Sequence, residues 1–200
     1  MPRRRRLEFL LIVAIAAGTP IAATLLYLFA PPGGTTNHGE LLAPVELDAA
    51  LLPEQAPDWQ LLVVGAPACD EDCQARLCAI AQARLVNVGE LERVGRLWLL
   101  DGPGTPSEEI AVRPGCGRQL PAEIPMTVPD IDVRAGVQVR RATAAQLAAL
   151  PAPAASFAAA DYIYVLDPLR RVIMRYPPDA PVKDIASDLR RLLRLSQRAG

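Results

Sequence analysis

The run of 22 uncharged residues from Phe9 to Ala30 constrains this chain more than any other feature of its sequence. As a helix, such a run is long enough to cross a hydrocarbon core of roughly 30 Å, so we predict a transmembrane helix over residues 9–30. The alternative is a cleaved signal peptide, whose apolar part is typically only about 7 to 15 residues long. The length of the run therefore favours an anchor that is retained.

Clustered positive charge lies before this run and not just after it. Residues 3–6 are all arginine, and no comparable basic cluster directly follows Ala30. Because arginine-rich flanks stay in the cytoplasm, we expect residues 1–8 to be a cytoplasmic tail and residues from Pro31 onward to be exported. This predicts a single-pass protein of a bacterial inner membrane with a periplasmic C-terminal part and the lipid bilayer as a partner. The formal net charge of −1 gives no overall attraction to nucleic acid.

The exported part holds all four cysteines of the chain. Disulfides form and persist in oxidising compartments such as the periplasm. Four cysteines allow three pairings, and the sequence does not choose among them. We therefore expect disulfide bonds, with the partners left open.

The sequence predicts an α/β domain over residues 59–200, behind a linker and N-terminal extension over residues 31–58. Residues 59–65 and 94–100 are valine- and leucine-rich runs typical of buried strands. An apolar helical pattern between them runs from Asp70 to Gly89. A strand, a helix and a strand in this order favour a parallel pair with a right-handed crossover.

The second half of this domain begins with a proline-rich insertion over about residues 101–160. Within it, Val137 to Arg140 indicates a short strand, and Thr143 with Gln146 forms the pattern of a capping box that starts a short helix. After it come two β-rich runs joined by a proline turn, and then an amphipathic helix that begins at Pro181. The two runs, residues 162–166 and 171–176, predict a hairpin.

Three of the cysteines lie in the stretch ACDEDCQARLC, at the expected helix start. On one face of a helix, Cys69 and Cys73 would have Cβ atoms about 5 to 6 Å apart, whereas a relaxed disulfide needs about 3.8 Å. Closure would then require unwinding of the first turn, which suits a labile disulfide or a two-thiolate site for Cu(I). Residues 70–72 are acidic and disfavour a nearby thiolate. A purely structural bridge is the alternative.

Cys78 follows Cys73 by five positions, which turns it about 140° away around a helix. It therefore does not share the site of the other two cysteines. One interpretation is a structural disulfide with Cys116 from the long insertion. The other, slightly favoured, is a free buried cysteine that behaves as a small hydrophobic residue.

The order of these elements resembles the thioredoxin-like fold, and within it the Sco/SenC family. The resemblance rests on the N-terminal anchor, on the Cys69-x-x-x-Cys73 spacing after an apolar strand, and on the segment Ile163 to Pro168. Sco/SenC proteins are membrane-anchored and deliver copper or handle thiols during cytochrome c oxidase assembly. The resemblance implies Cys69 and Cys73 as a redox pair or as copper ligands, copper as the cofactor, and oxidase subunits or assembly factors as partners.

The chain also departs from that family. Counting back from Ile163 places the family's histidine ligand at Ala159, and the chain's one histidine, His38, lies in the expected linker. The Cys-x-x-Cys signature of thioredoxins is absent as well. The pattern therefore favours an assembly factor over an enzyme. The alternatives are a non-catalytic scaffold protein with a structural disulfide and a thiol oxidoreductase of broad substrate range.

Overall fold

The computed structural model describes residues 3–29, 37–53, 56–106, 136–151 and 157–196. The chain divides into two compact units, residues 1–36 and residues 37–200. The first unit holds the helix α1 (Arg3–Phe29), which continues through Pro20. Across the described residues, no helix is found with both the length and the apolar character that a membrane span requires. The transmembrane role of residues 9–30 therefore stays a prediction.

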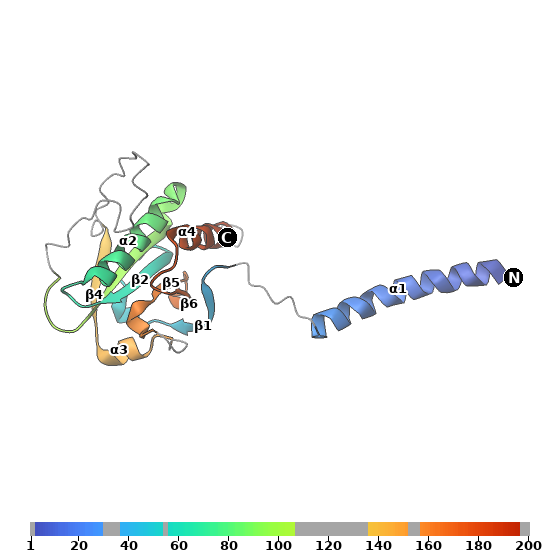
Figure 1. The fold of residues 1–200 in the computed structure, drawn as a ribbon, viewed down its shortest axis with the longest axis horizontal. Helices are drawn as coiled ribbons and strands as arrows, with labels where there is room; N and C mark the ends of the chain where they lie inside the picture. Colours follow the sequence, from blue (N-terminus) through green and yellow to red (C-terminus); the bar gives the residue numbers. More distant parts are fainter. Residues whose placement is uncertain (1–2, 30–36, 54–55, 107–135, 152–156, 197–200) are drawn as a thin grey trace. The chain divides into compact units, whose positions relative to one another are not determined.

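The second unit is built on a six-stranded sheet with the order β1-β6-β5-β2-β3-β4 (Figure 1). The central strand β2 is parallel to β3, and β3 is parallel to β4, whereas β5 and β6 run antiparallel to their neighbours. The strands are β1 (Glu40–Glu46), β2 (Trp59–Gly65), β3 (Val94–Asp101), β4 (Val137–Ala142), β5 (Ile163–Leu166) and β6 (Arg171–Tyr176). The predicted parallel pair and the predicted hairpin are both confirmed.

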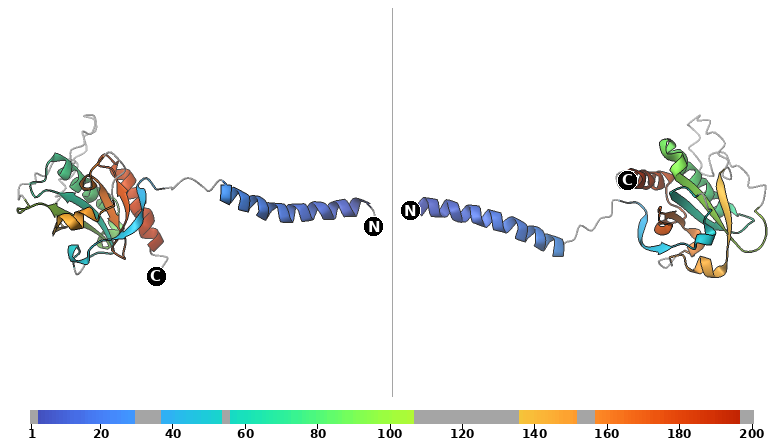
Figure 2. Two further views of the ribbon diagram at one scale, coloured as in Figure 1. Left: turned by 90° about the horizontal axis from the view of Figure 1, so that it is seen from below. Right: turned by 180° about the vertical axis from the view of Figure 1, so that it is seen from behind.

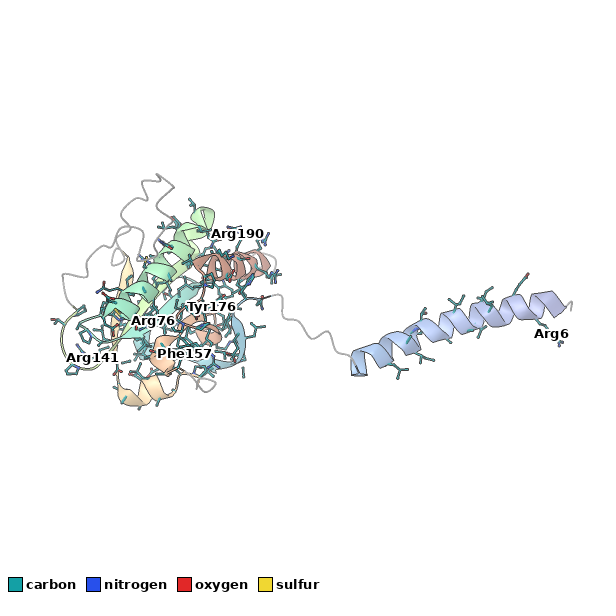
Figure 3. All side chains as sticks on the ribbon, viewed as in Figure 1. Arg6, Arg76, Arg141, Phe157, Tyr176 and Arg190 are labelled. Atoms are coloured by element: carbon teal, nitrogen blue, oxygen red, sulfur yellow. A yellow bond between two sulfur atoms is a disulfide. The ribbon has the colours of Figure 1, made fainter. Side chains whose placement is uncertain are left out.

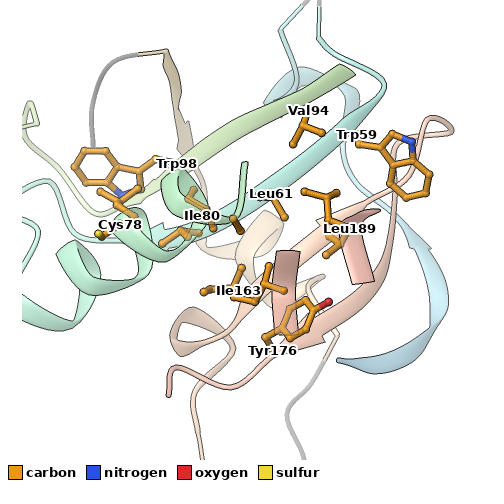
Figure 4. Close-up of a cluster of buried hydrophobic side chains, with 14 of the residues drawn as sticks. Trp59, Leu61, Cys78, Ile80, Val94, Trp98, Ile163, Tyr176 and Leu189 are labelled. Carbon is orange, nitrogen blue, oxygen red and sulfur yellow. The ribbon is translucent and has the colours of Figure 1, made fainter. Parts of the chain in front are cut away.

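One face of the sheet is covered by two helices, α2 (Glu71–Leu85) and α4 (Val182–Ser196), which lie side by side in the views of Figures 1 and 2. Successive side chains of a strand point to opposite faces, so Leu61 and Val63 of β2 pack under these helices. They join a cluster that contains both tryptophans, and in it Trp98 lies beside Cys78 (Figure 4). This cluster is the larger part of the core.

The opposite face is covered by short elements. These are η1 (Ala49–Leu51), α3 (Ala144–Ala148) and η4 (Ala159–Asp161), packed on the alternate residues Leu62 and Val64 of β2. The predicted capping box is confirmed, because Gln146 N donates to the Thr143 hydroxyl and the Gln146 side chain accepts from Thr143 N. The chain between α2 and β3 forms the 3-10 segment η2 (Val88–Arg93), which is kinked at Glu90.

The second unit begins well before Trp59, the first residue of the predicted domain. Part of the expected linker forms β1, which pairs antiparallel with β6 at the edge of the sheet. The residues that lead into β1 are held by α4, because the buried carboxylate of Asp188 accepts hydrogen bonds from His38 N (2.8 Å) and Gly39 N (2.9 Å). An edge strand that is mostly exposed and contains Pro44 has little sequence signal, which is why the pattern did not reveal it.

Candidate site at the Cys69–Cys73 disulfide

Cys69 and Cys73 are joined by a disulfide bond, with an S–S distance of 2.02 Å and Cα atoms 5.2 Å apart. The bridge lies between the end of β2 at Gly65 and the first turn of α2. Since β2 is the central strand of the sheet, the bridge sits at the carboxyl edge of the parallel part of the fold. In open α/β sheets, ligands and reactive groups gather at this edge.

The helix starts one residue later than the sequence suggested. Asp70 is the N-cap, and its carboxylate accepts a hydrogen bond of 2.9 Å from Cys73 N. Cys69 therefore precedes the helix, and only Cys73 lies within its first turn. The predicted unwinding of that turn is wrong, because the bridge closes from outside the helix while the N-cap hydrogen bond is kept.

Cys69 has an unusual backbone conformation. Its φ of 45° lies in the left-handed region, which a residue with a side chain occupies at a cost of about 1 to 2 kcal/mol. Two hydrogen bonds hold it there: Cys69 N donates to Ala66 O at 2.9 Å, and Gln74 Nε2 donates to Cys69 O at 2.8 Å. The bridge and these bonds thus maintain a strained residue next to the sulfur.

The bridge is buried. Cys69 is 1% exposed and Cys73 is 2% exposed, so a partner cannot reach either sulfur without a local opening of the chain. The two residues differ in their surroundings, since Ala68 and Asp70 on either side of Cys69 are exposed. Cys73 instead lies on the sheet-facing side of α2, where its sulfur packs against Gly65.

Two side chains with buried donors, Arg76 and Trp98, lie at the end of β2, where the Cys73 sulfur packs against Gly65, and the sequence did not reveal either as a site residue. Arg76 is only 5% exposed and follows Cys73 by three positions on the inner face of α2; Figure 3 labels it. Its Nη2 donates to Val64 O at 3.3 Å, whereas its Nε and the indole Nε1 of Trp98 find no acceptor among the described residues. Burial lowers the pKa of Arg76 below its usual value. The available signal was an arginine in an otherwise apolar helix face.

Cys78 is also disulfide-bonded, so the interpretation of Cys78 as a free buried thiol is wrong. It is 3% exposed and lies on the part of α2 that meets Trp98. Free cysteines and disulfide-bonded cysteines are both commonly buried, so a buried position on a helix does not tell one from the other. The proposed partner, Cys116, lies outside the described residues, and the Cys78–Cys116 pairing stays a prediction.

The residues here do not form a copper site of the Sco kind. Ala159, at the position expected for the family's histidine, lies in η4, where its carbonyl accepts a hydrogen bond from Tyr164. His38 instead lies 3.7 Å from Asp184 of α4. Within the described part of the chain, no group of three or more potential metal-ligating side chains is found. Cys69 and Cys73 would have to be reduced before they could offer thiolates to a metal.

Comparison with known proteins agrees with this architecture. A family model described as "Transmembrane-like, thioredoxin-like, C-terminal domain" matches residues 120–196. This match supports a thioredoxin-like fold for the C-terminal part of the domain. The matched region contains the hairpin and α4 but begins after Cys69 and Cys73, so it supports the fold and says nothing of the disulfide. A search of curated proteins finds no significant match.

Proposed function

We propose that this protein is a membrane-anchored thiol–disulfide protein that exchanges disulfides with exported partners through Cys69 and Cys73. The observation that carries the proposal is the Cys69–Cys73 bridge itself, placed between the central strand and the first turn of α2 in a thioredoxin-like domain. A dithiol partner would reduce the bridge, and the partner's two thiols would leave as a disulfide.

The size of the loop supports exchange over a purely structural role. A disulfide stabilises a fold mainly by restricting the unfolded chain, and the restriction grows with the length of the loop it closes. The Cys69–Cys73 bridge spans a sequence separation of only 4. Such a bridge contributes little to the stability of a domain that already has two apolar clusters around a six-stranded sheet.

The backbone of Cys69 gives a second reason. Its φ of 45° is held by the bridge to Cys73 together with two hydrogen bonds, and reduction would remove the covalent one of these constraints. Strain that is relieved on reduction makes a bridge easier to reduce. The bridge therefore has the local features of a disulfide that is reversibly reduced to two thiols.

The pathway is proposed from the resemblance to Sco/SenC proteins. We place the protein in cytochrome c oxidase assembly, anchored by residues 9–30 in the inner membrane, with the domain in the periplasm. Oxidase subunits or assembly factors would be its partners. Because the residues present do not make a Sco-type copper site, we derive no step through copper.

The second candidate is a non-catalytic scaffold protein in the same pathway. Its supporting observation is the burial of both sulfurs, at 1% and 2% exposure. In that case the bridge would hold the turn between β2 and α2, and partners would contact the outer surface of the domain.

The two candidates differ in what happens when the bridge is removed. The decisive variant is Cys69→Ser with Cys73→Ser, assayed for cytochrome c oxidase activity in cells that make the protein at normal levels. Exchange predicts loss of oxidase activity, with Cys78→Ser as the matched control for loss of another disulfide-bonded cysteine. Full oxidase activity in the double variant would reject the exchange function and favour the scaffold.

A further inference from the structure

We propose that Arg76 and Trp98 form a receiving site for the Cys73 thiolate that is released when the Cys69–Cys73 bridge opens. The inference rests on the proposed exchange function and names its leaving group. It assigns a role to two buried side chains that the fold alone does not explain.

The geometry converges on the end of β2. A Cβ atom placed on Gly65 would lie 2.7 Å from Cys73 Sγ and 3.3 Å from Trp98 Nε1. Arg76 Nη2 donates to the carbonyl of Val64, the residue directly before Gly65. The sulfur, the indole N–H and the guanidinium thus surround the same two residues of the strand.

One N–H group of each side chain is unsatisfied while the bridge is closed. Trp98 Nε1 and Arg76 Nε are buried and find no acceptor within the part of the chain that the structure describes. Buried donors without acceptors carry a free-energy cost, and native structures rarely keep them without a reason. A disulfide sulfur is a weak acceptor, whereas a thiolate bears a full negative charge.

The carboxylates around Arg76 do not fully compensate its buried positive charge. Asp161 of η4 and two residues at the start of α2, Asp70 and Asp72, act on Arg76 at long range, yet burial still dominates and lowers its pKa. Asp70 is occupied by the N-cap hydrogen bond to Cys73 N. The acidic residues disfavour a thiolate, while the N-terminus of α2 and Arg76 favour one.

The exchange step then has a direction. A thiolate of the partner attacks Cys69 Sγ, the Cys69–Cys73 bond breaks, and Cys73 leaves as a thiolate beside Arg76 and Trp98. The partner's second thiol loses its proton to solvent and attacks the partner sulfur of the mixed disulfide, which releases Cys69 as a thiolate that takes up a proton. Two electrons pass to this protein, and the partner dithiol becomes a disulfide.

The surroundings of the two cysteines support attack at Cys69. It precedes the helix in a turn whose neighbouring residues Ala68 and Asp70 are exposed, so a small opening of that turn uncovers its sulfur. Uncovering Cys73 would require α2 to leave the sheet. The thiol that stays buried is therefore the leaving group.

The test uses the full chain in mild detergent, with glutathione as the probe. The reduction equilibrium is measured in glutathione buffers, and the pKa of Cys73 in the reduced protein is measured from its alkylation rate against pH, with mass spectrometry to separate the cysteines. We expect Arg76→Met to raise the pKa of Cys73 by about one unit and to disfavour reduction about tenfold. Trp98→Phe should shift both quantities in the same direction by a smaller factor.

Two further variants separate charge from folding. Arg76→Lys keeps a cation and should retain most of the wild-type pKa and equilibrium. Arg84→Met removes a guanidinium from the same helix whose hydrogen bonds go to Val94 O and Leu91 O, and it should leave both quantities unchanged. If Arg76→Met fails to fold, Trp98→Phe still decides the question, because wild-type values in that variant would overturn the receiving site.

The outcomes also separate this inference from the proposed function. Wild-type values in both Arg76→Met and Trp98→Phe would overturn the receiving site, while a reducible bridge would leave the exchange function standing. A lower pKa for Cys69 than for Cys73 would overturn the proposed direction of attack. A wild-type bridge that glutathione cannot reduce without unfolding would reject both proposals.

Discussion

Gly65 and Cys73 are packed so closely that a Cβ atom at residue 65 would lie 2.7 Å from the Cys73 sulfur. We therefore expect Gly65→Ala to lower the free energy of unfolding by about 1 to 3 kcal/mol, because the last residue of β2 has no space for a side chain. Urea denaturation of the oxidised protein measures the loss. Gly89→Ala is the control, since a Cβ there meets nothing within 4 Å. Equal stability of the two variants would contradict this packing.

Asp188 should be among the most sensitive polar residues of the domain. It is 2% exposed and accepts hydrogen bonds from His38 N, Gly39 N and the Tyr176 hydroxyl. Asp188→Ala leaves these donors without an acceptor and should cost roughly 3 kcal/mol. Tyr176→Phe removes one of the three bonds and should cost only about 1 kcal/mol.

Hydrogen exchange locates the damage caused by Asp188→Ala. Since the carboxylate holds the residues that lead into β1, the amides of β1 should lose protection before those of β2. Uniform loss of protection throughout the sheet would show that β1 does not depend on Asp188.

The buried phenol of Tyr164 should make the domain less stable at alkaline pH. Burial raises its pKa to about 12, against about 10 in the unfolded chain, so the fold favours the neutral phenol. The stabilisation is complete below pH 10 and is lost as the pH rises from about 10 to 12, by up to roughly 2 to 3 kcal/mol. Tyr176 is also buried with a raised pKa and loses stability in the same alkaline range, so only a comparison with a Tyr164 variant isolates this contribution.

The measurement is the denaturation midpoint of wild type and of Tyr164→Phe between pH 8 and about 11.5. At pH 8 the variant should be less stable by about 1 kcal/mol, because the Tyr164 hydroxyl donates to Ala159 O at 2.7 Å. The difference should shrink as the pH rises. A constant difference over the whole range would contradict the raised pKa.

The turn of the β5–β6 hairpin contains an arginine in a conformation that favours glycine. Arg170 has a φ of 63°, and the turn is held by Asp167, whose carboxylate accepts from Leu169 N and Arg171 N at 2.9 Å. Arg170→Gly should raise the free energy of unfolding by up to about 1 kcal/mol, whereas Arg170→Ala should not. Thermal unfolding compares them, and equal melting temperatures would contradict the strain at this residue.

Patterns within a short window of sequence predicted much of this fold. The valine- and leucine-rich runs located β2 and β3, the proline turn located the hairpin, and Thr143 with Gln146 located the start of α3. In each case the residues that specify the element lie within it. The edge strand β1 was missed because its pairing partner is more than 120 residues away and its side chains are mostly exposed.

The candidate site was predicted in part for the same reason. Spacing and position brought Cys69 and Cys73 together, since both lie in one strand-to-helix turn. The burial of the bridge and its contact with Gly65 and Trp98 depend on how α2 lies on the sheet. Arg76 appeared to be one more charged helix residue until the packing placed it on the inner face. An arginine in an otherwise apolar helix face was the only local signal, and it does not show which strand the side chain reaches.

The most direct test of the account is the reduction potential of the Cys69–Cys73 bridge in the folded full chain. The protein is equilibrated with glutathione or dithiothreitol buffers, quenched with acid, alkylated, and analysed by mass spectrometry of the peptide that carries both cysteines, while circular dichroism reports the fold. The account predicts half-reduction at a potential above about −270 mV, in the range of thiol-exchange proteins, with the fold intact. A bridge that stays closed below about −300 mV, or that opens only as the domain unfolds, would contradict it and identify a structural disulfide.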